Sequence, residues 1–339
     1  MRFEFYHSGL DNVPKLSVDG TVGNSIHLSH WQGNETPAEV KADTSTEIAL
    51  NVAASPNRYA LTQGIELVTN NHFDTDGVLS VWTMLNGERA LELRDKLIPA
   101  AEAGDFSEFT NENAIRASIA IQGSDQPITA DNEGSPLAHQ LAGAPVDDDA
   151  RAYDLVLPEV ERLLTRTDEY ENLWCGPWQQ IAISIDSFER GASNVREFAD
   201  AKLSLITIAR DVFGPSGFDP TVHAAPFSAI SRYAKGQLFL IAIPYQNSWA
   251  YRIDYPYYSW AETIVRPRIE RRNFAPLLSS LNQLETGGAG RWNLDTSELS
   301  SAVKFTGSDG RLAASMFQPD QVANAIRAEF ASSAAGVAG

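Results

Sequence analysis

The chain has almost no cysteine: Cys175 is the only one in 339 residues. A single thiol can form no intrachain disulfide and can build no thiolate metal cluster. Cys175 follows Trp174 and precedes a Gly-Pro-Trp segment. This aromatic setting is typical of a packed thiol rather than of a nucleophile.

Long apolar runs are also missing. The longest, 237–244, is shorter than the roughly 18–20 residues that cross a bilayer, and its pattern predicts a buried strand. The N-terminal segment 1–7 lacks the apolar core of a signal peptide. We therefore expect a cytoplasmic protein that does not enter a membrane.

Basic residues are scarce relative to acidic ones. The chain has 26 Lys and Arg against 44 Asp and Glu, which gives a net charge of −18 at pH 7. A field of this sign repels polyanions, so nucleic acid is disfavoured as a partner and a nuclease is disfavoured as a function. Hydrophobic residues make up 43% of the chain, as in ordinary globular proteins, so we expect a packed core.

Strand and helix signals alternate in the N-terminal part of the chain. Segments 26–29 and 64–69 have strand character, and segments 47–53 and 78–85 have helical character. This alternation predicts an α/β fold with a mainly parallel sheet and flanking helices.

Two domains are expected, because domains usually contain roughly 100–200 residues. Segment 180–185 has strand character, and 195–213 is interpreted as holding a helical stretch. Several prolines and glycines between 214 and 227 then indicate a boundary. We predict an α/β domain over residues 1–226 and a smaller α+β domain over 227–339.

A polar turn between the strand at 64–69 and the helix at 78–85 carries the strongest site signal. His72, Asp74 and Asp76 alternate there, and alternate side chains of an extended segment point the same way. Imidazole and carboxylate donors together suit manganese or zinc, which activate water for hydrolysis. Gly77 permits a turn into the helix, whose first amides can hold a phosphate.

Other interpretations of this turn are available. An EF-hand calcium loop is excluded, because its first and twelfth positions hold His72 and Thr83 instead of acids. A plain Asx-rich turn that caps a helix explains the spacing as well as a metal site does. A second cluster, His27, His30 and Asn34, could complete a metal shell or could simply satisfy local backbone groups.

These two segments resemble motifs of the DHH phosphoesterase superfamily. The run from His72 to Ser80 is similar to its first motif, especially in the exonuclease branch, with Asp-x-Asp-Gly between a strand and a helix. The segment from Ser29 to Asn34, followed by a Ser-Thr helix start at Ser45, is similar to its Asp-His-His motif. The chain as a whole also resembles an uncharacterised bacterial family.

The sequence departs from the superfamily pattern at defined places. His30 aligns with the middle histidine of the Asp-His-His motif, but Ser29 and Trp31 replace its neighbours. The histidine that leads the first motif falls at Asn70, and the two motifs occur in reversed order along the chain.

The resemblance implies roles for individual residues. It implies that His72, Asp74 and Asp76 bind a divalent metal, and that His30 is a further ligand or the general acid. These four residues form the expected catalytic set. For substrate binding the resemblance and the nearby positions indicate Asn34, Asn71 and Ser45.

The only dense basic run contains Arg266, Arg268, Arg271 and Arg272. Arginine grips phosphate through two parallel hydrogen bonds, so Arg266 and Arg268 are candidate substrate contacts. The same run could instead form a solvated face or salt bridges to the many acids.

Two hypotheses of function follow. The first is a metal-dependent phosphoesterase-like hydrolase for a small phosphorylated substrate, with manganese favoured over zinc and magnesium. The second is a non-enzymatic binding or interaction protein whose hydrolase site has degraded. Convergence of His30 with the His72 segment favours the enzyme, whereas an exposed aromatic patch over 249–260 favours the binding protein.

Overall fold

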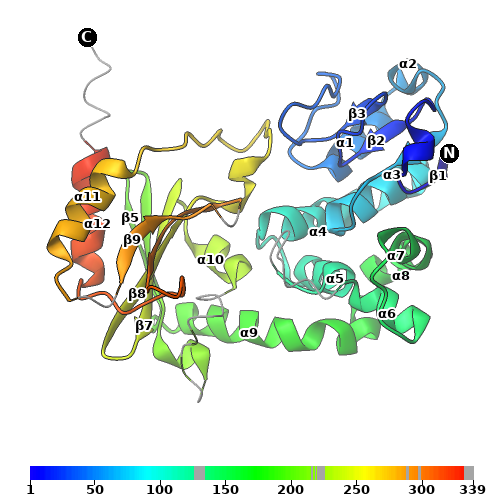
Figure 1. The fold of residues 1–339 in the computed structure, drawn as a ribbon. Helices are drawn as coiled ribbons and strands as arrows, with labels where there is room; N and C mark the ends of the chain where they lie inside the picture. The colour runs from blue at the N-terminus through cyan, green and yellow to red at the C-terminus, as the bar shows by residue number, and fades with distance from the viewer. Residues whose placement is uncertain are drawn as a thin grey trace, which may run out of the picture. The chain divides into compact units, whose positions relative to one another are not determined.

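The computed structural model describes residues 1–125, 134–214, 217, 219, 226–287, 290–296 and 299–331 (Figure 1). The chain divides into two compact units. The first comprises Met1–Gln179 and Trp260–Arg268, and the second comprises Gln180–Ser259 and the chain from Ile269 onward.

A four-stranded parallel sheet forms the centre of the first unit, in the order β1-β4-β2-β3. The strands are β1 (Arg2–Phe3), β2 (Leu16–Val18), β3 (Ile26–Leu28) and β4 (Leu67–Thr69). Leu16 pairs with Ile26 on one side and with Val68 on the other. Every residue of β2 and β4 is buried, as is usual for strands inside a parallel sheet.

Helices account for most of the first unit. They are α1 (Ser45–Ala54), α2 (Arg58–Thr62), α3 (Thr75–Glu92), α4 (Arg94–Phe106), α5 (Glu112–Gln122), α6 (Pro136–Ala142), α7 (Asp149–Val156) and α8 (Val160–Thr165), with 3-10 turns η1 (Ser8–Leu10), η2 (Leu157–Glu159) and η3 (Thr167–Tyr170). Side-chain caps fix where the central ones begin: the Thr44 hydroxyl accepts from the Glu47 N–H at α1, and the Asp74 carboxylate accepts from the Gly77 N–H at α3. Helix α9 (Glu171–Glu189) begins in the first unit and ends in the second.

The second unit contains a six-stranded mixed sheet in the order β5-β6-β7-β8-β10-β9. Its strands are β5 (Asn194–Phe198), β6 (Leu203–Thr207), β7 (Leu238–Tyr245), β8 (Ser248–Asp254), β9 (Arg291–Leu294) and β10 (Ser301–Thr306). Only β6 and β7 pair in parallel among these described strands, and the other pairs are antiparallel. The remaining elements are η4 (Arg210–Phe213), α10 (Phe227–Tyr233), η5 (Tyr257–Trp260), α11 (Ala275–Leu284) and α12 (Pro319–Phe330).

Alternation along β7 builds a core on each face of this sheet. Leu238 and Leu240 join a cluster that includes side chains of α11 and α12. Phe239 and Ile241 join a separate cluster with side chains of α10. Because successive strand residues point to opposite faces, one strand supplies both cores.

The α/β prediction is confirmed, but several predicted elements differ from the structure. Segment 180–185 lies inside helix α9, and segment 195–213 forms β5, β6 and η4 rather than one helix. The two units separate near residue 180, whereas the Pro/Gly-rich segment suggested a boundary near 226. The physical reason is that β6 pairs with β7, which ties 203–207 into the second sheet.

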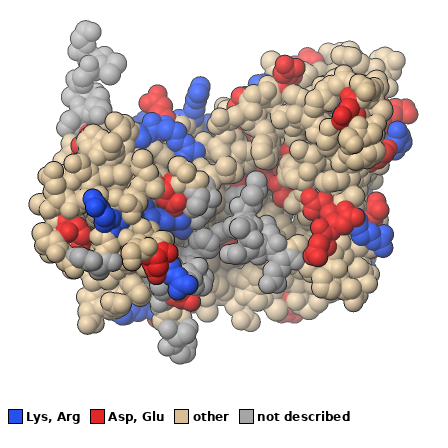
Figure 2. Space-filling model, viewed as in Figure 1, with Lys and Arg blue, Asp and Glu red and all other residues tan. Residues whose placement is uncertain are grey.

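No helix in the described part of the chain is long and apolar enough to span a membrane. On the face shown in Figure 2, Lys and Arg side chains lie in small groups among Asp and Glu side chains. The aromatic run over 249–260 is mostly buried, so it does not form the exposed patch that a binding surface would need.

Candidate metal centre

The carboxyl ends of three neighbouring strands carry polar side chains. Asp19 follows β2 directly, His30 follows β3 by two residues, and the turn from Asn70 to Asp74 follows β4. Because β4, β2 and β3 are adjacent and parallel, these ends meet at one edge of the sheet. Open α/β sheets place their ligands at this edge.

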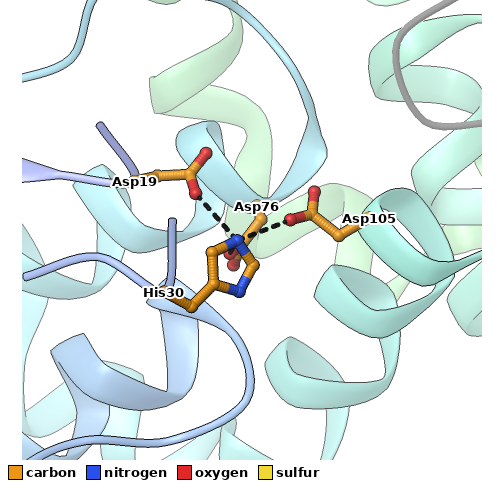
Figure 3. A group of neighbouring side chains, drawn as sticks. All are labelled: Asp19, His30, Asp76 and Asp105. Atoms are coloured by element: carbon orange, nitrogen blue, oxygen red, sulfur yellow. Dashed lines mark ion pairs between the residues drawn. The ribbon is translucent and has the colours of Figure 1, made fainter. Parts of the chain in front are cut away.

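Two of these side chains, Asp19 and His30, form with Asp76 and Asp105 what we call the His30 set (Figure 3). One donor atom from each lies within 4.8 Å of the others. Nε2 of His30 lies 3.0 Å from Oδ2 of Asp105 and 3.5 Å from Oδ1 of Asp19. It lies 3.9 Å from Oδ2 of Asp76. All four side chains are buried.

The tautomer of His30 follows from its other ring nitrogen. Nδ1 lies 2.6 Å from the backbone carbonyl oxygen of Asp43, which can only accept a hydrogen bond, so Nδ1 carries a proton. In the neutral ring, Nε2 then presents a lone pair to the carboxylates. Nε2 makes no hydrogen bond within the described residues. A histidine that donates through one nitrogen to a carbonyl and leaves the other free is the usual arrangement of a metal ligand.

A second group, the His72 set, consists of Asp19, His72 and Asp74. Nε2 of His72 lies 3.1 Å from Oδ2 of Asp19 and 3.3 Å from Oδ2 of Asp74. Asp19 therefore belongs to both sets: its Oδ1 faces His30 and its Oδ2 faces His72.

The charge of the two sets together suits a cation. They contain four carboxylates and two imidazoles. Burial foremost, and then the charges of Asp74 and Asp76, raise the pKa of Asp19 and of Asp105 well above the usual range. Buried carboxylates this close together are stable when they are protonated or when they coordinate metal.

In the His72 set, by contrast, the charged forms of His72 and Asp74 are favoured. Burial favours neutral forms of both His72 and Asp74, but their mutual attraction outweighs it. As a result, the pKa of His72 is raised well above its usual value and the pKa of Asp74 is lowered. Without metal, these two groups therefore behave as an ion pair.

The start of α1 holds the Asp76 carboxylate in place. The backbone N–H groups of Ser45 and Thr46 donate to its two oxygens at 2.6 and 2.8 Å. The Ser45 hydroxyl donates to Oδ1 of Asp19 at 2.9 Å. Free amides at a helix N-terminus stabilise a carboxylate, so α1 orients two ligands of the His30 set.

Close helix packing brings in Asp105 from the last turn of α4. A Cβ atom added at Gly104 would lie 2.5 Å from the Cβ atom of Thr75, at the start of α3. The absence of a side chain at this position lets α4 approach α3, which carries Asp76.

Tyr153 supports the turn that carries His72. Its hydroxyl donates to the His72 carbonyl oxygen at 3.1 Å and accepts from Nδ2 of Asn70 at 3.0 Å. A Cβ at Gly77 would lie 2.7 Å from the same hydroxyl, so only glycine fits there without displacement. Asn70 therefore supports this turn through its hydrogen bond to Tyr153.

The three donors predicted from the alternating pattern, His72, Asp74 and Asp76, do not all lie in one set. His72 and Asp74 face each other, as expected for extended backbone. Asp76 lies in the first turn of α3, where the chain is already helical, and it joins His30 instead. The turn also caps α3 through Asp74, so the capping interpretation holds alongside the candidate metal centre.

The proposed substrate-binding residues lie in different settings. Asn34 Nδ2 donates to Trp31 O and Glu262 Oε2, and Asn71 Oδ1 lies 3.1 Å from His72 Nδ1. His27, which the sequence grouped with His30 as a candidate ligand, belongs to neither donor set; its Nδ1 accepts from the Glu35 N–H.

The two candidate arginines also differ from each other. Arg266 is paired with three carboxylates, those of Asp43, Glu102 and Glu108. A guanidinium so occupied is not available to a phosphate, so the salt-bridge interpretation describes Arg266 better. Arg268 is exposed and forms no ion pair with a described residue.

Sequence reasoning missed Asp19 and Asp105. Asp19 had a usable signal, because an Asp-Gly pair stands directly after an apolar strand segment, and a second Asp-Gly pair occurs at Gly77. Asp105 had none, because it lies within a helix and reaches the site only through tertiary packing.

An α/β fold with a buried Asp/His centre that could hold a divalent ion defines the general class of this protein. The chain belongs to a family of unknown function, DUF6687, whose model matches residues 2–337. No curated protein matches it. Among solved structures, the chain is similar to the pGpG-specific phosphodiesterase PggH from Vibrio cholerae, with 11% sequence identity and a TM-score of 0.33 over 94% of this chain and 99% of that chain. A likeness of this degree supports no functional conclusion.

Proposed function

We propose that this protein is a divalent-metal-dependent phosphoesterase that acts on a small phosphorylated substrate. The observation that carries the proposal is the pair of donor sets that share Asp19. Two ions a few ångströms apart, joined by a shared ligand, are the arrangement that many phosphatases and nucleases use. The partial resemblance to the DHH superfamily adds support at His30, His72, Asp74 and Asp76.

Each set would hold one ion. Asp19, His30, Asp76 and Asp105 would bind the first, and Asp19, His72 and Asp74 would bind the second. Bound metal of this kind lowers the pKa of a coordinated water and stabilises charge on a phosphoryl oxygen. A mixture of carboxylate and imidazole ligands favours manganese, because magnesium rarely accepts imidazole and zinc prefers fewer oxygen ligands.

The burial of His30 and His72 indicates what each residue would do and from which side substrate would approach. His30 acts as a ligand rather than as the general acid, because Nδ1 is committed to Asp43 O and Nε2 is completely buried. The His72 side chain is 25% exposed, whereas the side chains of the His30 set are at most 3% exposed. Substrate would therefore approach from the His72 side. The net charge of −18 favours a small phosphoester over a polymer.

Hydrolysis assays with and without MnCl2 test this function. The substrates would be p-nitrophenyl phosphate, bis(p-nitrophenyl) phosphate and a panel of mononucleotides and short dinucleotides. We expect manganese-dependent turnover that falls by at least about 100-fold in Asp76→Asn, because loss of a ligand costs more than loss of an outer support. Asp147→Asn, an exposed site with the same charge change, is the control.

A different result would support the non-enzymatic alternative. If the wild-type protein retains manganese but hydrolyses none of these esters, the centre has a binding or structural role and the hydrolase proposal is wrong.

A further inference from the structure

One segment of the first unit comes from far along the chain. Trp260–Arg268 belongs to this unit, although Ser259 before it and Ile269 after it belong to the other. We call Trp260–Arg268 the strap. It packs against the loop that carries His30, more than two hundred residues earlier in the sequence.

The strap meets the His30 loop at several points. The Glu262 N–H donates to the His30 carbonyl oxygen at 2.8 Å. The Trp260 ring lies edge-on to the His30 imidazole, with centroids 5.0 Å apart. Glu262 also accepts hydrogen bonds from the Gly33 N–H and from Asn34 Nδ2. The backbone and ring of His30 are therefore both in contact with the strap.

Asp43 connects the strap to the imidazole itself. Its backbone carbonyl accepts the Nδ1 proton of His30. Its carboxylate accepts from the N–H groups of Ile264, Val265 and Arg266, the last two at 2.8 and 3.0 Å, and from Arg266 Nη1 at 2.8 Å. Asp43 is 1% exposed, so the accepting end of these bonds is buried. One residue thus joins the strap at one end to a candidate metal ligand at the other.

Arg266 connects the strap to the helix that carries Asp105. Its Nη2 lies 2.7 Å from Oε1 of Glu102, and its Nη2 and Nε contact Glu108 at 2.6 and 2.9 Å. Its guanidinium lies 4.9 Å from the centroid of the Phe106 ring, next to Asp105 in α4. Arg266 therefore holds the supports of two different ligands, His30 and Asp105, at a fixed separation.

We infer that the strap is a positioning device for the ion of the His30 set, and that Asp43 and Arg266 are its positioning residues. The inference rests on the proposed metal centre. Outer partners that orient metal-bound histidines commonly affect metal affinity by about 10–100-fold. Because coupling between two binding events is reciprocal, manganese binding and docking of the strap stabilise each other.

Calorimetric titration of the metal-free protein with MnCl2 tests the inference in variants of the full chain. We expect Arg266→Gln and Asp43→Asn to weaken the tighter manganese site by about 10–100-fold. Arg291→Gln is the matched control: it removes the same charge from an exposed residue of β9, outside the first unit, and it should leave the affinity unchanged. Arg266→Lys should recover part of the loss, because it keeps the charge but not the fork of donors.

Thermal melts with and without MnCl2 separate positioning from simple structural support. A purely structural role lowers the melting temperature of both forms equally, whereas a positioning role reduces the increase that manganese produces. If Arg266→Gln does not fold, hydrogen exchange of the wild-type protein tests the inference instead. Manganese should then slow exchange of the amides of residues 264–266. Unchanged exchange overturns the inference.

The outcomes distinguish this inference from the proposed function. A wild-type protein that binds no manganese contradicts both. A wild-type protein that binds manganese, with Arg266→Gln binding as tightly, contradicts only the role of the strap.

Discussion

The two donor sets share Asp19 but differ in access to water. The side chains of the His30 set are 0–3% exposed, whereas His72 is 25% and Asp74 is 11% exposed. An ion in a sealed site exchanges slowly and mainly organises the surrounding chain, while an ion in an open site can exchange ligands with substrate and water. If the proposed centre holds two ions, we therefore expect the His30 set to retain its ion and the His72 set to exchange ligands with substrate.

The two sets also differ in how many surrounding groups hold their ligands in place. The His30 set is held by amides at the start of α1, by Asp43 and by the strap. In the His72 set, His72 and Asp74 lie on a single turn, which is supported by Asn71 and by Tyr153. We therefore expect the His30 set to bind its ion more tightly.

Asp19→Asn should have the largest effect, because Asp19 is the only side chain in both sets among the described residues. We expect manganese content after dialysis to fall from two ions per chain to none, and hydrolysis to fall by at least about 100-fold. Elemental analysis of the dialysed protein measures this. Asp147→Asn should keep both ions, and two ions retained in Asp19→Asn would contradict a shared ligand.

Single-set substitutions should separate the two ions. His72→Ala should lose the weaker, exchangeable ion and keep the tighter one, whereas Asp105→Asn should weaken the tighter one. Manganese titration followed by electron paramagnetic resonance distinguishes bound from free ions. The same loss in both variants would mean that the donors form one site rather than two.

Tyr153→Phe should have a smaller effect, confined to the His72 side. The change removes the hydroxyl that bonds the His72 carbonyl and Asn70, at a cost of about 1–3 kcal/mol in the free energy of unfolding. We expect the weaker manganese site to lose about 10-fold in affinity and the tighter site to be unaffected. Tyr59→Phe, at an exposed residue, is the control for both the denaturant melt and the titration.

The smallest expected effect is an increase in stability, for Asp105→Asn in the metal-free protein. In the metal-free protein, Asp105→Asn removes a carboxyl group whose pKa is raised first by burial and then by the charges of Asp74 and Asp76. A folded-state pKa above the unfolded value destabilises the fold as pH rises through it, so the variant should melt a few degrees higher than the wild type at neutral pH. With manganese present the order should reverse. Equal melting temperatures without metal would contradict a raised pKa of Asp105 in the folded protein.

Local patterns predicted the part of the site that lies on one turn. The strand at 64–69 and the helix from 78 correspond to β4 and α3, and the predicted donors of the turn lie where a cation could bind. The alternation rule failed at Asp76, because the backbone becomes helical at Thr75 and redirects that side chain. His30 was identified from its spacing to His27 and from the motif resemblance, and its role as part of a metal centre stays a prediction.

Several features of the site and fold depend on tertiary contacts and could not be predicted from local sequence patterns. Asp105 is an ordinary helix residue until α4 packs against α3, and no local pattern reveals that contact. Arg266 looked like a phosphate contact in a basic run, but three carboxylates from distant segments enclose it. Segment 195–213 was predicted to be helical, and pairing with β7 made its centre a strand instead.

Anomalous diffraction at the manganese edge, from crystals of the protein grown with MnCl2, tests the two-site arrangement most directly. We predict two peaks about 3.5–4 Å apart, one among Asp19, His30, Asp76 and Asp105 and the other among Asp19, His72 and Asp74. A single peak, or no peak at these side chains, would contradict a shared two-ion centre.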